Sequence, residues 1–286
     1  MVLESYMFVC GMPGVVSRFI FDLAGTINTP VMDSYMPFRL TSTLGALWIE
    51  PLEDAALRTR LHLKGANWAG FQADGCPHAL WSGTTVDAYI SFLVRHRFNS
   101  VRLPLSSVLV NDNTAVGFNC AGFRGQSTLL VLDDVLTRLQ AAGILVVLDM
   151  HTSVQPEANT GLWCGRHTEC TAEAEAPILR AWQTLARRYC AYPNVIAADL
   201  YNEPFTATWG VGSATQRWDL AAARLGNAVL AECPRLLIFV EGVGQHGGGW
   251  NNCAPNGCCE SQPTAAASSR PAVHAAWSQP HHMRMR

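Results

Sequence analysis

Four apolar segments of the sequence contain or are followed by polar or ionisable side chains. Arg102 lies in "SVRLPLS", His151 follows "ILVVLDM", Asn202 and Glu203 follow "VIAADLY", and Glu241 follows "LLIFV". Carboxyl and imidazole groups can transfer protons, and a buried guanidinium needs a carboxylate partner. If the fold brings these side chains together, they form a candidate active site.

Five apolar segments alternate along the chain with segments of helical periodicity. We predict strands over residues 61–67, 100–106, 144–150, 195–201 and 236–241. Apolar residues recur three and four positions apart over 85–97, 127–142, 173–191 and 214–232, which predicts helices. Strands that are apolar throughout and separated by helices are typical of a parallel sheet with helices on its outer side. The predicted fold class is therefore α/β.

Two α/β architectures fit this order of elements, a closed (β/α)8 barrel and an open doubly wound sheet. The open sheet usually has a glycine-rich GxGxxG turn after its first strand, and "KGANWAGFQ" lacks that pattern. In a barrel, the carboxyl ends of all strands meet at one face, where active sites are built. The polar residues at the strand ends therefore favour a (β/α)8 TIM barrel, of which this chain supplies about five βα units.

The composition excludes several classes of partner. The chain is 49% hydrophobic and 15% charged, with a formal net charge of −2, and its Lys and Arg residues are scattered. The sequence therefore shows no basic cluster that would bind nucleic acid or an anionic membrane, and we expect a neutral partner. No stretch reaches the roughly 18 uninterrupted apolar residues of a membrane span, and no clear signal peptide is present. The oligomeric state is not predicted.

The ten cysteines indicate an oxidising, extracellular compartment. Cys164 and Cys170 enclose a short loop that a local disulfide closes easily, so we predict that they are bonded. Thiols without a role are one alternative. Zinc is another, with Cys253 and "NGCC" as candidate ligands, but no pair of CxxC elements has the spacing of a zinc site. We therefore predict no metal.

The apolar segments and the polar residues after them follow the order found in one enzyme family. The matching segments, between Leu61 and about Gln245, are "KGANWAGFQ", "FNSVRLPLS", "GILVVLDMHT", "VIAADLYNEP" and "LLIFVEGV". In these segments the chain resembles glycoside hydrolase family 5, the cellulase-like retaining β-glycosidases. The resemblance implies a TIM barrel that acts on a polysaccharide or oligosaccharide and needs no cofactor.

The resemblance also implies roles for the residues at the strand ends. Retaining hydrolysis needs a general acid for the leaving oxygen and a second carboxylate, about 5–5.5 Å away, as nucleophile. Glu203 matches the family's acid/base residue, and Asn202 matches the residue that hydrogen-bonds the sugar 2-hydroxyl. Arg102 matches the arginine that orients the nucleophile. His151 matches the histidine that contacts the sugar on the non-reducing side of the cleavage point.

Each of these assignments has a structural alternative. Glu203 could be a solvated loop glutamate, and Asn202 could serve only to form the turn. Arg102 could make an ion pair at a strand end, and His151 could be a core residue with its hydrogen bonds satisfied.

Two more residues near the strand ends have a weaker claim to function. Trp68 could stack on the apolar face of a pyranose ring or pack beneath a loop, with neither favoured. We predict that Asp149 is structural and faces away from His151.

The sequence departs from the family pattern after Gln245. The family's nucleophile is a glutamate at the end of the seventh strand in a "GEFG"-like setting, and no such segment is present. Residues 246–286 contain no apolar strand segment, so we predict an irregular or disordered tail and an incomplete barrel. Glu241 lies on the neighbouring strand rather than across the barrel mouth, which makes it unsuited as the nucleophile, and Glu260 lies in the tail.

Three regions and two functions follow from these patterns. Residues 1–60 form an N-terminal extension that could cover the barrel floor as a strand pair, residues 61–245 form a partial glycoside hydrolase domain, and residues 246–286 form the tail. The expected function is retaining hydrolysis of O-glycosyl bonds in β-glucans, impaired because the nucleophile is missing. The alternative is a non-catalytic carbohydrate-binding or vestigial protein.

Overall fold

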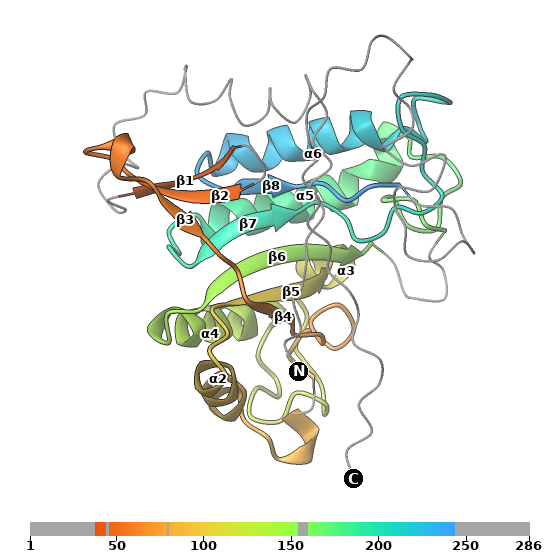
Figure 1. Cartoon of the computed structure of the whole chain (residues 1–286). Helices are drawn as coiled ribbons and strands as arrows, with labels where there is room; N and C mark the ends of the chain where they lie inside the picture. The colour runs from red at the N-terminus through yellow and green to blue at the C-terminus, as the bar shows by residue number, and fades with distance from the viewer. Residues whose placement is uncertain (1–37, 44–45, 79, 154–159, 244–286) are drawn as a thin grey trace.

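The strands of the computed structural model form two sheets (Figure 1). The model describes residues 38–43, 46–78, 80–153 and 160–243. An antiparallel sheet contains β1 (Phe38–Thr43), β2 (Ala46–Pro51) and β3 (Thr59–Leu61). A parallel sheet has five strands in sequential order, β4 (Gly65–Asn67), β5 (Ser100–Ser106), β6 (Leu145–Thr152), β7 (Val195–Asp199) and β8 (Leu237–Phe239).

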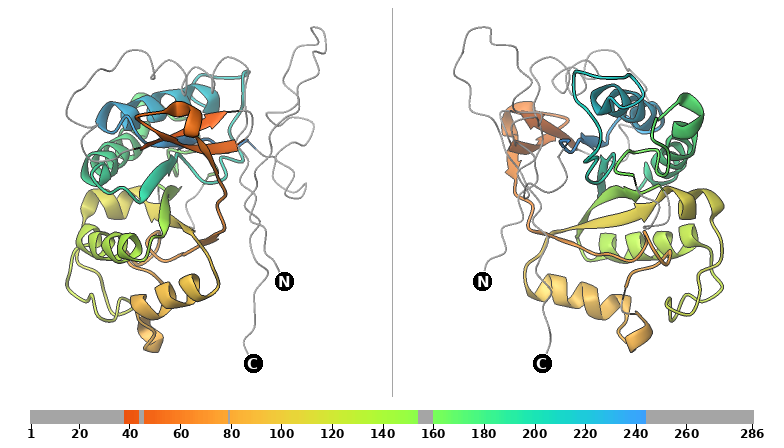
Figure 2. Two further views of the ribbon diagram at one scale, coloured as in Figure 1. Left: turned by 60° about the vertical axis from the view of Figure 1, so that its left-hand side comes forward. Right: turned by 90° about the vertical axis from the view of Figure 1, so that its right-hand side faces the viewer.

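The helices lie along one face of the curved parallel sheet, and the antiparallel sheet lies on its other side, beside β8 (Figures 1 and 2). The α-helices are α2 (Val86–Arg95), α3 (Ser107–Asp112), α4 (Thr128–Ala141), α5 (Ala172–Tyr189) and α6 (Trp218–Glu232). Two short 3-10 helices, η1 (Ala55–Leu57) and η2 (Leu80–Ser82), complete the elements. None of the described helices is long and apolar enough to cross a membrane.

Local sequence explains where the main elements form. Every residue of β5 and β7 is buried, as expected for strands covered on both faces. The side chains of Thr85 and Thr171 accept hydrogen bonds from backbone N–H groups in the first turns of α2 and α5, so these helices begin at true N-caps. Helix α5 also has glutamates in its first turn and arginines in its last, which complements its dipole.

The predicted order of parallel strands and intervening helices is confirmed, and two details differ. The first predicted strand, 61–67, is split, because Leu61 ends β3 and the parallel strand β4 begins only at Gly65. Between them, the backbone N–H of Lys64 donates to the side chain of Asn99, where the chain passes from one sheet to the other. Helix α3 was missed because six residues are too few to show a 3.6-residue period.

The small sheet packs against the side of the parallel sheet that the helices leave open. Strands β1 and β2 form the predicted antiparallel pair. Leu40 and Leu47 from this pair pack against a buried cluster that includes Val147, Ile196 and Leu237. This part of the N-terminal extension thus packs on the open face of the parallel sheet, and its role as a cover for the barrel floor stays a prediction. Residues 1–37 and the predicted tail, 246–286, lie outside the described residues.

Candidate active site

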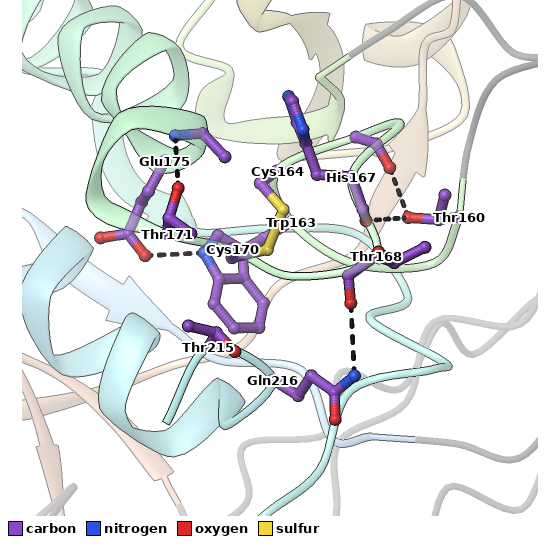
Figure 3. Close-up of a disulfide and its surroundings, with 12 residues drawn as sticks. Thr160, Trp163, Cys164, His167, Thr168, Cys170, Thr171, Glu175, Thr215 and Gln216 are labelled. Atoms are coloured by element: carbon purple, nitrogen blue, oxygen red, sulfur yellow. Dashed lines mark hydrogen bonds between the residues drawn. A yellow bond between two sulfur atoms is a disulfide. The ribbon is translucent and has the colours of Figure 1, made fainter. Parts of the chain in front are cut away.

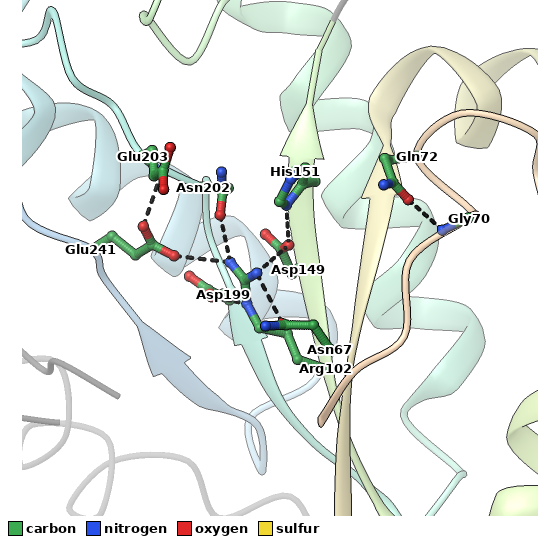
Figure 4. Close-up of polar contacts among 10 residues, drawn as sticks. All are labelled: Asn67, Gly70, Gln72, Arg102, Asp149, His151, Asp199, Asn202, Glu203 and Glu241. Atoms are coloured by element: carbon green, nitrogen blue, oxygen red, sulfur yellow. Dashed lines mark hydrogen bonds and ion pairs between the residues drawn. The ribbon is translucent and has the colours of Figure 1, made fainter. Parts of the chain in front are cut away.

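The guanidinium of Arg102 is the centre of a polar cluster contributed by β5, β6, β7 and the segment after β8 (Figure 4). Its Nε donates to Asp199 at 2.9 Å, its Nη1 lies 2.9 Å from Asp149, and its Nη2 donates to Glu241 at 2.9 Å. Nη2 also donates to Asn202 Oδ1 at 3.0 Å. Arg102 is only 3% exposed, so each nitrogen of a buried cation faces a different carboxylate, as its desolvation requires.

One cation therefore balances three carboxylates in this cluster. Burial raises the pKa of Asp199, and the negative charge of Asp149 raises it further. Burial likewise raises the pKa of Glu241, with Asp199 as the next cause. Burial lowers the pKa of Arg102, but the three carboxylates, first Asp149, raise it by more, so the guanidinium stays charged. These shifts favour retention of one proton near neutral pH, and because both oxygens of Glu241 accept hydrogen bonds, we place that proton on Asp199.

His151 is held by Asp149, and the prediction that Asp149 faces away from it is wrong. The Nδ1 atom of His151 lies 2.7 Å from Oδ2 of Asp149, the oxygen that also contacts Arg102. Residues i and i+2 of a strand share one face, so the two side chains on β6 had to lie together. Asp149 is fully buried, whereas the His151 side chain is 23% exposed. Asp149 thus fixes the ring orientation and leaves Nε2 for other contacts.

Glu203 follows β7 in an uncommon backbone conformation. Its φ is +49°, in the left-handed region that non-glycine residues rarely adopt. Its backbone N–H donates to Oε2 of Glu241 at 2.9 Å, and the N–H of the preceding Asn202 donates to the carbonyl of Met150 at 3.0 Å. In the view of Figure 4, the partly buried Glu203 and Asn202 lie on the same side of Arg102 as His151.

The structure thus connects five of the sequence-predicted site residues and separates one. Arg102, Asn202 and Glu241 are in direct contact, and His151 and Glu203 join them through Asp149 and Glu241.

Trp68 does not join this cluster by a side-chain contact. It is only 8% exposed, and its ring packs 5.1 Å from that of Tyr89. Its backbone N–H donates to the carbonyl of Arg102 at 2.9 Å, which places it at the sheet but leaves little of the ring for a sugar. These contacts favour the packing alternative.

Three members of the cluster, Asn67, Asp149 and Asp199, were not identified as site residues from the sequence. Asp199 ends the otherwise apolar "VIAAD" of β7, and Asn67 Oδ1 accepts from Arg102 Nη1 at 3.4 Å. Asp149 and Asp199 are cross-strand neighbours in the parallel register. A carboxylate within a fully buried strand needs a cationic partner, and that rule could have paired Asp199 with Arg102.

A disulfide joins Cys164 to Cys170, the pair predicted from their short loop (Figure 3). Their Cα atoms are 5.5 Å apart. The N–H of Cys170 donates to the carbonyl of Thr215 at 2.8 Å, and the neighbouring Trp163 donates from Nε1 to Glu175 of α5 at 2.7 Å. The disulfide loop is thereby fastened to α5 and to the segment before α6.

Two further disulfides join distant parts of the chain, Cys76 to Cys120 and Cys190 to Cys233. Cys253 and the "NGCC" cysteines, considered above as zinc ligands, lie outside the described residues. Among the residues that the structure does describe, no group of three or more His, Cys, Asp or Glu side chains is arranged to hold a metal ion.

Two curated proteins that are similar in sequence to this chain are endoglucanases. The chain is 32% identical over 185 residues to an endoglucanase of Paenibacillus polymyxa, which covers 63% of this chain and 45% of that protein. It is 34% identical over 189 residues to the major extracellular endoglucanase of Xanthomonas campestris pv. campestris, which covers 64% and 38% respectively. The chain thus spans less than half the length of these two curated relatives.

Solved structures of an endocellulase and of an endoglucanase catalytic domain are also similar to this chain. An endocellulase from Pyrococcus horikoshii in complex with cellotetraose superposes with a TM-score of 0.62 and 28% identity, covering 72% of this chain and 57% of that one. The catalytic domain of the Xanthomonas campestris enzyme gives a TM-score of 0.60 and 31% identity, covering 71% and 57%. The sequence profile "Cellulase (glycosyl hydrolase family 5)" matches residues 61–282. The chain therefore belongs to glycosyl hydrolase family 5.

Proposed function

We propose that this chain carries the acid/base and sugar-binding part of a retaining β-glucan hydrolase site, with Glu203 as the proton donor. The observation that supports it best is the polar cluster around Arg102, which Asn202 joins directly, His151 through Asp149, and the backbone N–H of Glu203 through Glu241. These are the residues that match the family pattern, and they lie toward the carboxyl ends of parallel strands, where barrel enzymes bind substrate.

The residues have distinct roles in this proposal. Glu203 protonates the glycosidic oxygen as the bond breaks, because an oxocarbenium-like transition state places negative charge on the leaving group. Asn202 binds the sugar 2-hydroxyl, a contact that strengthens in the transition state. Arg102 orients Asn202 through its 3.0 Å hydrogen bond, and Asp149 orients His151 toward a neighbouring sugar.

We further propose that the described residues hydrolyse glycosidic bonds poorly, because their set of catalytic groups is incomplete. Retaining hydrolysis requires a second carboxylate that reaches the anomeric carbon. Asp149 and Asp199 are buried against Arg102, at 0% and 1% exposure. Glu241 follows β8, the strand next to β7, so it lies beside Glu203 rather than across the site from it, and its Oε2 accepts from the backbone of Glu203. The cluster therefore supplies a proton donor and sugar contacts but no carboxylate free to act as the nucleophile.

A cluster with sugar contacts but no nucleophile also supports the second candidate function, which is binding of β-glucan oligosaccharides without turnover. The Xanthomonas campestris relative is named an extracellular enzyme, and the three disulfides among the described residues fit the same compartment. We therefore propose an extracellular protein with a cello-oligosaccharide ligand.

Calorimetric titration with cellotetraose tests the sugar-binding site that both candidates share. We expect the full chain to bind cellotetraose, and Asn202→Ala and His151→Ala each to weaken binding by about three- to tenfold, the usual value of one hydrogen bond. Asn111→Ala is the matched control, because Asn111 bonds the carbonyl of Pro177 between α3 and α5. Equal affinity for all four proteins, or no binding by the unmodified chain, would contradict the proposed site.

A further inference from the structure

Glu241 lies between the guanidinium of Arg102 and the backbone of Glu203. Its Oε1 accepts from Arg102 Nη2 and its Oε2 accepts from the N–H of Glu203, each at 2.9 Å. Its own carbonyl accepts from Nε1 of the fully buried Trp218 at 2.8 Å. The residue is therefore fixed at its backbone by α6 and at its carboxylate by Arg102.

Glu241 contacts a residue whose backbone conformation needs support from its surroundings. A positive φ at a non-glycine residue costs about 1–3 kcal/mol and persists only where the surroundings hold it. Glu203 has φ +49° and precedes Pro204, a position at which proline further restricts the backbone. Its N–H donates to a carboxylate, which makes this a charge-assisted bond of the stronger kind.

We propose that Glu241 is a positioning residue, whose carboxylate links Arg102 to the backbone of Glu203 and so sets the direction in which the Glu203 side chain enters the site. This inference rests on the proposed role of Glu203 as the acid/base residue. It assigns Glu241 a function other than nucleophile, because Glu241 lies beside Glu203 on the neighbouring strand and its two carboxylate oxygens join Arg102 to the backbone of Glu203.

Only a glutamate satisfies both contacts. The bridge joins two donors, so it needs two acceptor oxygens at the end of a side chain of this length. Glu241→Gln keeps the length but offers one acceptor, and its amide NH2 then faces a donor. Glu241→Asp keeps both acceptors and the charge, but it is one methylene shorter and cannot span from Arg102 to Glu203. Both variants should therefore release the backbone of Glu203, for different reasons.

The backbone N–H of Glu203 can be observed alone, independently of turnover. The sequence contains a single Asn–Glu pair, Asn202–Glu203. A sample labelled with ¹³C at the Asn carbonyl and ¹⁵N in Glu therefore gives one HNCO signal, that of the Glu203 amide. We expect this proton to be shifted downfield and to exchange slowly with solvent, as an N–H bonded to a carboxylate does.

In Glu241→Gln and Glu241→Asp, the Glu203 amide proton should move upfield and exchange at least about tenfold faster, the factor expected for loss of one charge-assisted hydrogen bond. Glu232→Gln is the matched control, because Glu232 is a carboxylate paired with Arg187 on the surface of α6, and it should leave the signal unchanged. Far-UV circular dichroism verifies that each variant is folded. An unchanged shift and exchange rate in folded Glu241→Gln would overturn the proposal.

Turnover separates this inference from the proposed function. If Glu203 is the acid, Glu241→Gln should lower kcat by about a hundredfold with KM unchanged within about twofold, because a small misplacement of a catalytic group affects the chemical step. A released amide with turnover that does not depend on Glu203 would refute the acid/base role and leave the positioning contact established. Turnover that depends on Glu203 but is unaffected by Glu241→Gln would refute the positioning role alone.

Discussion

Replacement of Arg102 by lysine should destabilise the fold strongly, although it keeps the positive charge. The guanidinium contacts Asp149, Asp199 and Glu241 through three separate nitrogens. A lysine ammonium is one nitrogen on a shorter side chain, so we expect it to keep about one of the three contacts. Each lost hydrogen bond to a charged group is worth about 1.5–3 kcal/mol, so the loss of two in Arg102→Lys should lower the unfolding free energy by about 3–6 kcal/mol.

Urea denaturation followed by tryptophan fluorescence measures this loss, because Trp182 and Trp218 are fully buried. With a slope of about 1–3 kcal/mol per molar urea, the midpoint should fall by at least about 1 M. The loss should be larger at pH 8 than at pH 5, because carboxylates without a partner are protonated at the lower pH. Arg187→Lys is the control, since the exposed Arg187 pairs with Glu232 at the surface, and it should leave the midpoint unchanged.

Two results would refute this reasoning about Arg102. A loss below about 1 kcal/mol would mean that the buried carboxylates do not depend on the guanidinium fork. An equal loss at pH 5 and pH 8 would mean that their ionisation does not contribute to the effect.

Two further predictions concern stability. Burial raises the pKa of Asp199 to about 7 in the folded state, whereas its pKa in the unfolded chain is about 4. Between about pH 4 and 7 the folded state therefore binds a proton that the unfolded state has released, and the unfolding free energy should fall as the pH rises across that window. Asp199→Asn should reduce that slope in urea denaturation, and an unchanged slope would count against the assignment. Loss of the Cys190–Cys233 disulfide, which spans 43 residues, should cost about 4 kcal/mol, against about 2 kcal/mol for Cys164–Cys170, which spans 6, in paired Cys→Ser variants. Equal losses would show that loop closure does not set the difference.

The sequence predicted the parallel sheet because its strands are apolar over their whole length. In β5 and β7 every residue is buried, so burial on both faces was visible in the residue types alone. It also predicted which strand ends carry the polar residues of the cluster, since Arg102, Asn202 and Glu203 follow or interrupt such strands. These features depend on local pattern and on the rule that parallel strands share a direction.

The contacts among the site residues depend on register and backbone conformation, which the sequence does not display. Asp149 and Asp199 are paired across β6 and β7, and the register of these strands contains an irregularity between Val146 and Val147. The link from Glu241 to Glu203 goes to a backbone N–H at a positive φ, so side-chain types alone could not suggest it. The error about Asp149 and His151 was avoidable, because alternation along a strand places them on one face.

Turnover of a soluble aryl β-cellobioside by the 286-residue chain, compared with Glu203→Gln, tests the central claim most directly. With a general acid but no free nucleophile among the described residues, the rate should exceed the uncatalysed rate by no more than about 10²–10⁴-fold, and Glu203→Gln should remove that acceleration. A rate enhancement of about 10⁶-fold or more would contradict the proposed impairment. An acceleration of any size that survives Glu203→Gln would contradict the assignment of Glu203 as the acid.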